Sequence, residues 1–193
     1  MVSADSWFGV FMETVQTHET SAALREAAVN GDLKRWTEAL TGVVVGTFPK
    51  MGWRGAARGH RSDLLPVPRS EYMELDVVAF EAAGDRRWRF PVGVFELENS
   101  FVDDLIAYSL WKVLCVRASL RVVFCYRRDA SEGSELVRHL ADQVIDTMEI
   151  PVRSGLGGET LVIVGSRSEI ATFPYSVFKG WRLDANTARF RRN

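Results

Sequence analysis

The run Leu120–Tyr126, with the sequence LRVVFCY, restricts the fold of this chain more than any other segment. Short, almost unbroken apolar runs of this kind are typical of strands that are buried on both faces in the middle of a sheet. Because each face of such a sheet must be covered, helices are expected on both sides of it. The run therefore predicts an α/β fold with a mixed central sheet flanked by helices.

The composition agrees with a single domain over residues 1–193. The chain has 47% hydrophobic and 25% charged residues, which excludes a disordered chain, a collagen-like repeat and a low-complexity filament. At this length, folding buries roughly 70% of the surface that the unfolded chain exposes, so the core needs no metal or disulfide to hold it together. Cys115 and Cys125 lie among apolar neighbours without the spacing of a zinc module or a disulfide framework, and we expect both to be small core residues.

Charge and hydropathy exclude further classes of protein. The N-terminus lacks the basic residues of a secretory signal, and no apolar run approaches the roughly 18 residues of a membrane span, so we expect a cytoplasmic protein with no membrane partner. The formal net charge of -1 creates no overall attraction to nucleic acid. Nearly all of the 24 basic residues are arginines, which suit phosphate groups, but a GC-rich genome produces the same excess and is the stronger explanation.

Three segments read as helical. Ser21–Leu40 predicts two short helices, because Asn30–Asp32 supplies a break and a cap between them. Ser100, followed three residues later by Asp103, predicts the capped start of a helix through DDLIAYSLWKVLCV. After a glycine-tipped loop, the segment ELVRHLADQVIDTM predicts a further helix.

The extended segments predict a hairpin and two later strands. Glu71–Phe80 and Trp88–Leu97 read as strands on either side of turn residues Gly84 and Asp85. The segment ETLVIVG predicts another strand, and the chain finishes with an extended piece, FKGWRLDANTARFRRN. Together with the helices, these segments make the order helix, strand, strand, helix, strand ahead of the C-terminal part.

Acidic residues interrupt the two strands of the predicted hairpin. Because a strand sends alternate side chains to opposite faces, Glu96 and Glu98 project to one side, and Glu74 and Asp76 share one face of the partner strand. If the register places Asp76 beside Glu96, three carboxylates converge. Like charges at that distance raise one another's pKa unless a cation or a shared proton relieves them. Oxygen-rich acidic clusters suit Mg²⁺ or Mn²⁺.

A structural explanation of these acids stays open beside the functional one. Acids near strand ends are often solvated or paired with arginine, and Arg86, Arg87 and Arg89 lie in the same hairpin. Their position favours a site, because these acids interrupt otherwise apolar strands and are followed at once by a helix and a buried strand.

The order of elements and acids resembles the PD-(D/E)XK superfamily of restriction-endonuclease-like nucleases over residues 33–127. The resemblance implies an α-β-β-β-α-β core, with the missing first strand at about residues 53–60 and with residues 128–193 as a C-terminal extension. It implies that Asp76 and Glu96 hold one or two Mg²⁺ or Mn²⁺ ions. It also implies that Glu38, on the helix before the strands, corresponds to an acid that some members place there.

The sequence departs from the motif of that family at one important position. Glu98 stands where a lysine is usual, and the resemblance allows it to act as a general base or an extra metal ligand. Lys112 on the following helix is the alternative source of the lysine, since some families place it there; it is otherwise an ordinary solvated helix residue. Either arrangement makes Asp76, Glu96, Glu98 and Lys112 the candidate catalytic residues.

The function predicted from this resemblance is metal-dependent hydrolysis of phosphodiester bonds in nucleic acid, with DNA favoured over RNA. Arg54, Arg58 and Arg61, with Trp53 and His60 nearby, are candidate phosphate contacts. A chain of 193 residues leaves little room for a separate recognition domain, so specificity is expected from a partner subunit or a homodimer. The alternative function is a catalytically inactive domain of the same fold that binds nucleic acid or protein within a larger assembly.

Overall fold

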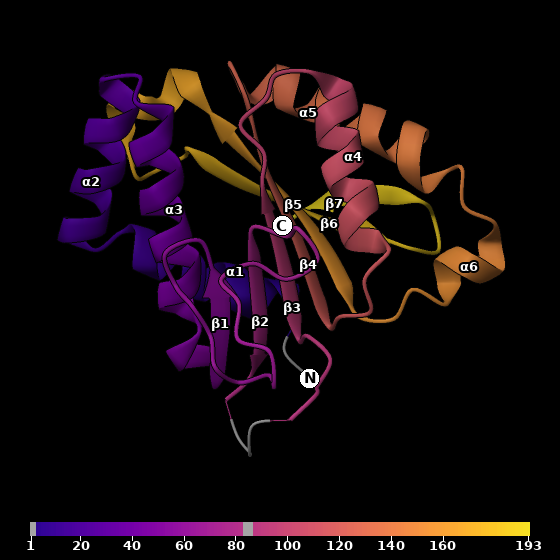
Figure 1. The fold of residues 1–193 in the computed structure, drawn as a ribbon. Coiled ribbons are helices and arrows are strands. Elements are labelled where there is room, and N and C mark those ends of the chain that lie inside the picture. Colours follow the sequence, from indigo (N-terminus) through magenta and orange to yellow (C-terminus); the bar gives the residue numbers. More distant parts are fainter. Residues whose placement is uncertain (1–2, 83–86) are drawn as a thin grey trace.

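One mixed sheet with helices on both faces makes up the fold (Figure 1). The computed structural model describes residues 3–82 and 87–193. The strands are β1 (Trp53–Ala57), β2 (Val77–Glu81), β3 (Gly93–Leu97), β4 (Leu120–Arg127), β5 (Glu159–Ser166), β6 (Phe178–Asp184) and β7 (Arg189–Arg192). The α-helices are α1 (Ala4–Val15), α2 (His18–Val29), α3 (Leu33–Thr47), α4 (Asp103–Leu114), α5 (Ala130–Leu140) and α6 (Ile150–Ser154). Short or irregular turns are η1 (Pro49–Met51), η2 (Ala141–Ile145) and η3 (Arg167–Thr172).

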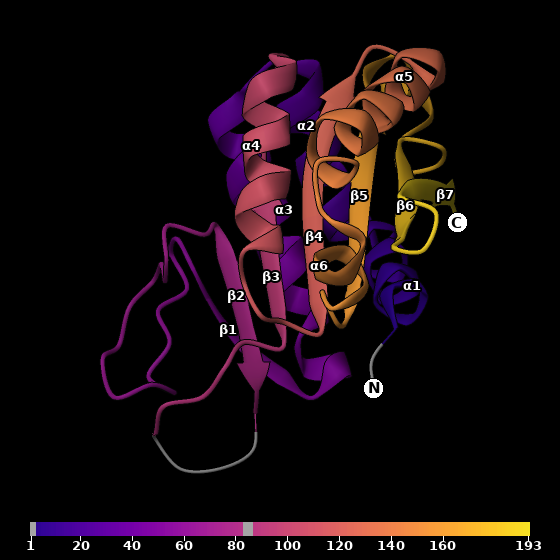
Figure 2. The ribbon, with the colours of Figure 1, turned by 90° about the vertical axis from the view of Figure 1, so that its right-hand side faces the viewer.

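The strands lie in the sheet in their order along the chain, from β1 at one edge to β7 at the other (Figure 2). Pairing is antiparallel from β1 to β3, parallel from β3 through β4 to β5, and antiparallel again from β5 to β7. The run α3-β1-β2-β3-α4-β4 therefore has the predicted α-β-β-β-α-β order of a restriction-endonuclease-like core. The first strand of that core, β1, lies where the sequence placed it.

The central strand β4 is buried along its whole length, as its apolar sequence predicts. Its side chains alternate between two hydrophobic cores: Phe124 packs with Trp7 and Phe11 of α1, whereas Val123 packs with Ile106 of α4. Helices α1, α2 and α3 thus cover one face of the sheet, and α4 and α5 cover the other (Figure 1).

The predicted break between α2 and α3 is confirmed, with local contacts that explain it. Gly31 adopts a left-handed φ of 65°, and the Asp32 side chain accepts a hydrogen bond of 3.0 Å from the Arg35 N–H. An N-cap of this kind satisfies a backbone donor that the first helical turn leaves free. Helix α3 runs past Leu40 to Thr47, because Val43 and Val44 continue its buried face.

The hairpin strands are shorter than predicted. Met73 and Glu74 adopt left-handed φ angles of 57° and 55°, so β2 begins only at Val77 and Glu74 does not share a strand face with Asp76. Strand β3 begins at Gly93, two residues after Pro91, which has no N–H to donate to a neighbouring strand. The turn predicted at Gly84 and Asp85 lies outside the described residues.

Two details of the helices on the other face differ from prediction. Helix α4 begins after Val102, and Ser100 does not cap it; the Ser100 hydroxyl instead accepts a hydrogen bond from the Val102 N–H. Helix α5 begins at Ala130 with Asp129 as its cap, so Gly133 lies inside the helix, and not in a loop. Gly133 faces β5 closely, since a Cβ there would lie 3.1 Å from Val164 Cγ1.

The C-terminal part extends the sheet by a strand and a hairpin. The strand predicted at ETLVIVG is β5, and the final extended piece folds into the antiparallel pair β6 and β7. Cys125 is buried, as expected, whereas Cys115 is exposed at the end of α4, so the prediction of a core position was wrong for that residue. In the part of the chain that the structure describes, no helix is long and apolar enough to cross a membrane.

Candidate active site

The pairing of β2 with β3 brings Asp76 and Glu96 together. Val77 pairs with Phe95 in this antiparallel ladder, so the next positions outward are Asp76 and Glu96. Two hydrogen bonds join the strand ends at this point. The Leu97 N–H, next to Glu96, donates to Asp76 Oδ2 at 2.7 Å, and the Asp76 N–H donates to Glu96 Oε1 at 3.4 Å. The register that the sequence analysis left as a condition, with Asp76 beside Glu96, is therefore the one found.

Helix α4 adds a lysine to this pair of acids. The helix packs its buried residues Ile106, Leu110 and Val113 toward the sheet, and this fixes Lys112 above the end of β3. Lys112 Nζ lies 2.8 Å from Glu96 Oε2 and donates a second hydrogen bond of 2.9 Å to the Glu74 carbonyl oxygen. Lys112 therefore connects the acid on β3 to the turn that precedes Asp76.

Burial is the dominant influence on both carboxyl groups. Glu96 is only 4% exposed, and this burial, with the negative charge of Asp76 added, raises its pKa from 4.5 to about 7, although the hydrogen bond from Lys112 opposes the change. Burial also raises the pKa of Asp76, against the Leu97 N–H and the charge of Lys112. Near neutral pH, Glu96 thus exchanges readily between its neutral and charged forms.

Glu98 faces the same side as Glu96 but makes separate contacts. Its Oε1 accepts from the Ser100 N–H at 2.7 Å, and its Oε2 accepts from the Ser109 hydroxyl on α4 at 3.3 Å. Among residues 3–82 and 87–193, no group of three or more His, Cys, Asp or Glu side chains is arranged to hold a metal ion. The expected convergence of three acids is therefore wrong, because these serine contacts hold Glu98 aside from Asp76 and Glu96.

The residues that do meet still fit a hard divalent cation. Mg²⁺ is commonly held by one or two carboxylates, with water and substrate phosphates completing its octahedron. Asp76 and Glu96 offer such oxygens, and the pKa of Glu96 is raised chiefly by burial, with the charge of Asp76 adding to it, which is a cost of the charged form that a cation would relieve. The chemistry of this donor pair therefore suits Mg²⁺ or Mn²⁺.

The other predicted site residues lie apart from this cluster. Glu38 is exposed on α3 and pairs with Lys34 at 4.0 Å; its described contacts do not include Asp76 or Glu96. Arg54 is exposed on β1 and pairs with Asp63 at 2.9 Å. Trp53 is buried in the core, which rules out the suggested stacking role for its ring.

The remaining two arginines lie in the connection between β1 and β2. Arg58 and Arg61 are exposed there, and this connection ends at Asp76. They accordingly belong to the same chain segment that delivers the first acid to the site, which keeps them as candidate phosphate contacts.

Sequence reasoning missed two contributors to the site. Ser109 orients Glu98, and the Glu74 carbonyl holds Lys112. The spacing of three residues between Ser109 and Lys112 places both on one face of a helix and is a signal that could have found the serine. The carbonyl contact follows from the left-handed turn at Met73 and Glu74, for which the sequence carries no glycine or asparagine signal.

The element order and the mixed sheet define an α/β domain whose core has the α-β-β-β-α-β order of restriction-endonuclease-like folds. No family model matches the chain, and no curated protein matches it. One solved structure, that of NucC from E. coli MS115-1 in its cAAA-bound form, aligns over 100% of this chain and 84% of that chain with a TM-score of 0.48 and 13% sequence identity. Score and identity are both too low for this similarity to indicate a function, so the assignment below depends on the residues of the site.

Proposed function

We propose that this chain is a metal-dependent nuclease that hydrolyses phosphodiester bonds of nucleic acid at the cluster of Asp76, Glu96 and Lys112. The observation that carries the proposal is the contact of Lys112 Nζ with Glu96 Oε2 at 2.8 Å, beside an Asp76 held by the Leu97 N–H. One buried acid, one half-buried acid and a lysine at the end of paired strands have little structural use, because burial of charge costs stability.

Asp76 and Glu96 are the residues that would hold Mg²⁺ or Mn²⁺. The bound ion would supply Lewis acidity, lowering the pKa of the attacking water and stabilising charge on the phosphoryl and leaving oxygens. Asp76 is positioned for this role by the Leu97 N–H, which donates to its Oδ2, while its own backbone N–H donates to Glu96 Oε1. Glu96 must lose its proton to bind the cation, so occupancy of the site rises as the pH passes about 7.

Lys112 supplies the positive charge that the motif position at Glu98 lacks. In the resting arrangement its ammonium group neutralises Glu96, and a phosphate entering the site offers it a second anionic partner. Glu98 supports the helix that carries Lys112, through its hydrogen bond with Ser109 one turn earlier. Arg58 and Arg61, on the connection that leads to Asp76, are proposed to contact the phosphate backbone.

The test is a cleavage assay on plasmid DNA, single-stranded DNA and RNA, with Mn²⁺ or with EDTA. We expect cleavage only with Mn²⁺, and a loss of about 100-fold or more in Asp76→Asn and Glu96→Gln, since metal contacts are worth several kcal/mol in the transition state. Glu38→Gln is the matched control, because it removes an exposed acid that pairs only with Lys34 in the described structure. Equal cleavage by wild type and Glu96→Gln refutes the assignment.

A second candidate function is a binding domain of the same fold without catalysis. The observation that favours it is Glu98 in the motif position of the lysine, held by Ser100 and Ser109. Calorimetric titration with Mn²⁺ separates the two functions. The nuclease predicts a binding site that is lost in Asp76→Asn, whereas the binding domain predicts no such site in the wild type.

A further inference from the structure

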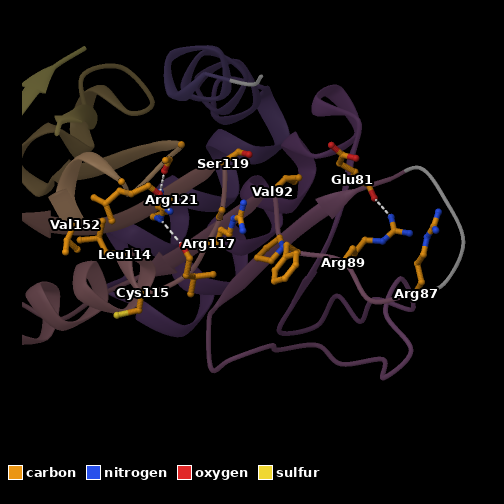
Figure 3. Close-up of a pocket in the computed structure, with 18 residues that line it drawn as sticks. Glu81, Arg87, Arg89, Val92, Leu114, Cys115, Arg117, Ser119, Arg121 and Val152 are labelled. Atoms are coloured by element: carbon orange, nitrogen blue, oxygen red, sulfur yellow. Dashed lines mark hydrogen bonds between the residues drawn. The ribbon is translucent and has the colours of Figure 1, made fainter. Parts of the chain in front are cut away.

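A large cavity lies at the end of the sheet opposite to the candidate active site. Its volume is about 1200 Å³, and Val92, Ser119 and Gly158, just before or at the starts of β3, β4 and β5, lie on its wall (Figure 3). Glu96 lies four residues beyond Val92, a distance of about 13 Å at the usual strand rise of roughly 3.3 Å per residue. The cavity is therefore separate from the acids, with the buried strand β3 between them.

Positive charge dominates the wall of this cavity. Arg87, Arg89, Arg117 and Arg121 line it, and among the described residues of the lining Glu81 is the one carboxylate. Arg89 donates to the Glu81 carbonyl oxygen at 2.9 Å. Arg87 and Arg117 are exposed and make no hydrogen bond or ion pair with the described residues, so their guanidinium groups are available to a ligand. An excess of arginine suits phosphate, which accepts the paired N–H donors of a guanidinium.

Arg121 has a structural role, because its guanidinium group is buried in the wall of the cavity and is not available to a ligand. It is 2% exposed, and its guanidinium donates to the carbonyl oxygens of Val116, Leu156 and Gly157 at 2.8–3.0 Å. These bonds tie the loop after α4 to the loop before β5. The two loops that border the cavity are thus held in place before any ligand arrives.

Aromatic side chains accompany the arginines at the mouth. Phe90 lines the cavity and is 77% exposed, and Trp88, two residues earlier, is 69% exposed. Exposed rings beside cationic groups are the arrangement on which unpaired bases stack in single-stranded nucleic acid. An inorganic anion leaves the rings without a partner, and a duplex has its bases stacked internally.

We propose that this cavity binds a single-stranded segment of nucleic acid, with Arg87 and Arg117 on its phosphates and Phe90 against a base. This inference deepens the proposed function. It rests on that function in one respect, namely that the bound polymer is also the substrate. The bound segment and the scissile bond then lie at opposite ends of the buried strand β3 and belong to one polymer that passes around it. The site would therefore select substrates that present an unpaired segment near the scissile bond.

The experiment measures binding without cleavage. Fluorescence anisotropy follows a labelled oligothymidine of about twelve nucleotides in EDTA, for the wild type and for Arg87→Gln/Arg117→Gln. We expect Kd to rise about tenfold or more in this double variant, and the slope of log Kd against log salt to fall by about 1.4, since each phosphate contact on a single strand contributes roughly 0.7. Phe90→Ala should weaken binding about tenfold with the slope unchanged.

Arg25→Gln/Arg138→Gln is the matched control, because it removes two exposed arginines of α2 and α5 that do not line the cavity. Binding within twofold of wild type in this control supports the proposal, and a loss equal to that of the cavity variant overturns it. Displacement of the strand by inorganic phosphate or thymidine monophosphate at matched phosphate concentration, or equal affinity for a duplex, also overturns it.

Failure of this inference is distinguishable from failure of the proposed function. Strand binding that depends on Arg87 and Arg117 but is followed by no cleavage in Mn²⁺ leaves the inference standing without the nuclease. Cleavage of the same oligonucleotide with unchanged Kd in the double variant leaves the nuclease standing without this site.

Discussion

The pH dependence of stability is a direct test of the buried acid at the site. Folding raises the pKa of Glu96 from 4.5 to about 7, so between these values the folded state binds a proton that the unfolded state releases. Stability from this residue is therefore fully present below about pH 4.5 and is lost as the pH rises through about 7. At about 1.4 kcal/mol per pH unit, the loss amounts to about 3 kcal/mol.

Glu96→Gln isolates this contribution, because the amide keeps the shape of the side chain and does not titrate. The difference in unfolding free energy between variant and wild type should grow by about 3 kcal/mol in favour of the variant from about pH 4 to about pH 9. For a domain of this size, that corresponds to a change of roughly 6 to 12 °C in the difference of Tm.

Guanidinium denaturation at several pH values, in EDTA, measures the difference directly. Titrating groups that lie far from Glu96 are present in both proteins, and their contributions cancel in the comparison. Glu38→Gln, at an exposed position, should show a difference that does not change with pH. A flat difference for Glu96→Gln over the same range would show that Glu96 is charged in the folded protein well below pH 7, and the account of the site given above would be wrong.

Three further outcomes are expected. Millimolar Mg²⁺ or Mn²⁺ should raise the Tm of the wild type more at pH 8 than at pH 6, because Glu96 must be charged to bind the ion. The same ions should not raise the Tm of Asp76→Asn, and a rise in that variant would contradict the site. Lys112→Met should reduce cleavage about 100-fold while Mn²⁺ binding by calorimetry persists, because the lysine competes with the cation for Glu96 Oε2; unchanged cleavage would make the lysine structural. Gly158→Ala should lower the unfolding free energy by about 1 to 3 kcal/mol, measured by guanidinium denaturation, since its φ is 67° and a Cβ would lie 2.5 Å from the Ala118 carbonyl oxygen; a neutral effect would show that the loop can move.

The sequence was most informative where one local pattern had one structural outcome. The apolar run of β4 could be placed in the centre of the sheet, because few other environments accept residues buried on both faces. The period of two along β3 correctly directed Glu96 and Glu98 toward the same helix, as their contacts with Lys112 and Ser109 show. To predict that Asp76 lies beside Glu96, only the register of the two paired strands had to be known in addition.

Contacts set by irregular backbone were beyond the sequence. The left-handed conformations of Met73 and Glu74 shorten β2 and aim a carbonyl at Lys112, and neither residue type favours that conformation. The cap of α4 failed for a related reason, because the chain passes Ser100 two residues before the helix begins and so uses its hydroxyl in a local turn. The choice between two roles of Lys112 also depended on the third dimension, since helix orientation decides whether the side chain meets Glu96.

The two contacts of Lys112 link Glu96 on β3 to the end of the connection between β1 and β2. One ammonium group fastens the Glu74 carbonyl, at the end of the long β1–β2 connection, to the carboxylate of Glu96. Loss of this ammonium group would remove the side-chain anchor at the end of the segment that carries Arg58 and Arg61. The β1–β2 connection should therefore be cut faster by a protease in Lys112→Met than in the wild type, because exposed segments with fewer anchoring contacts open more easily.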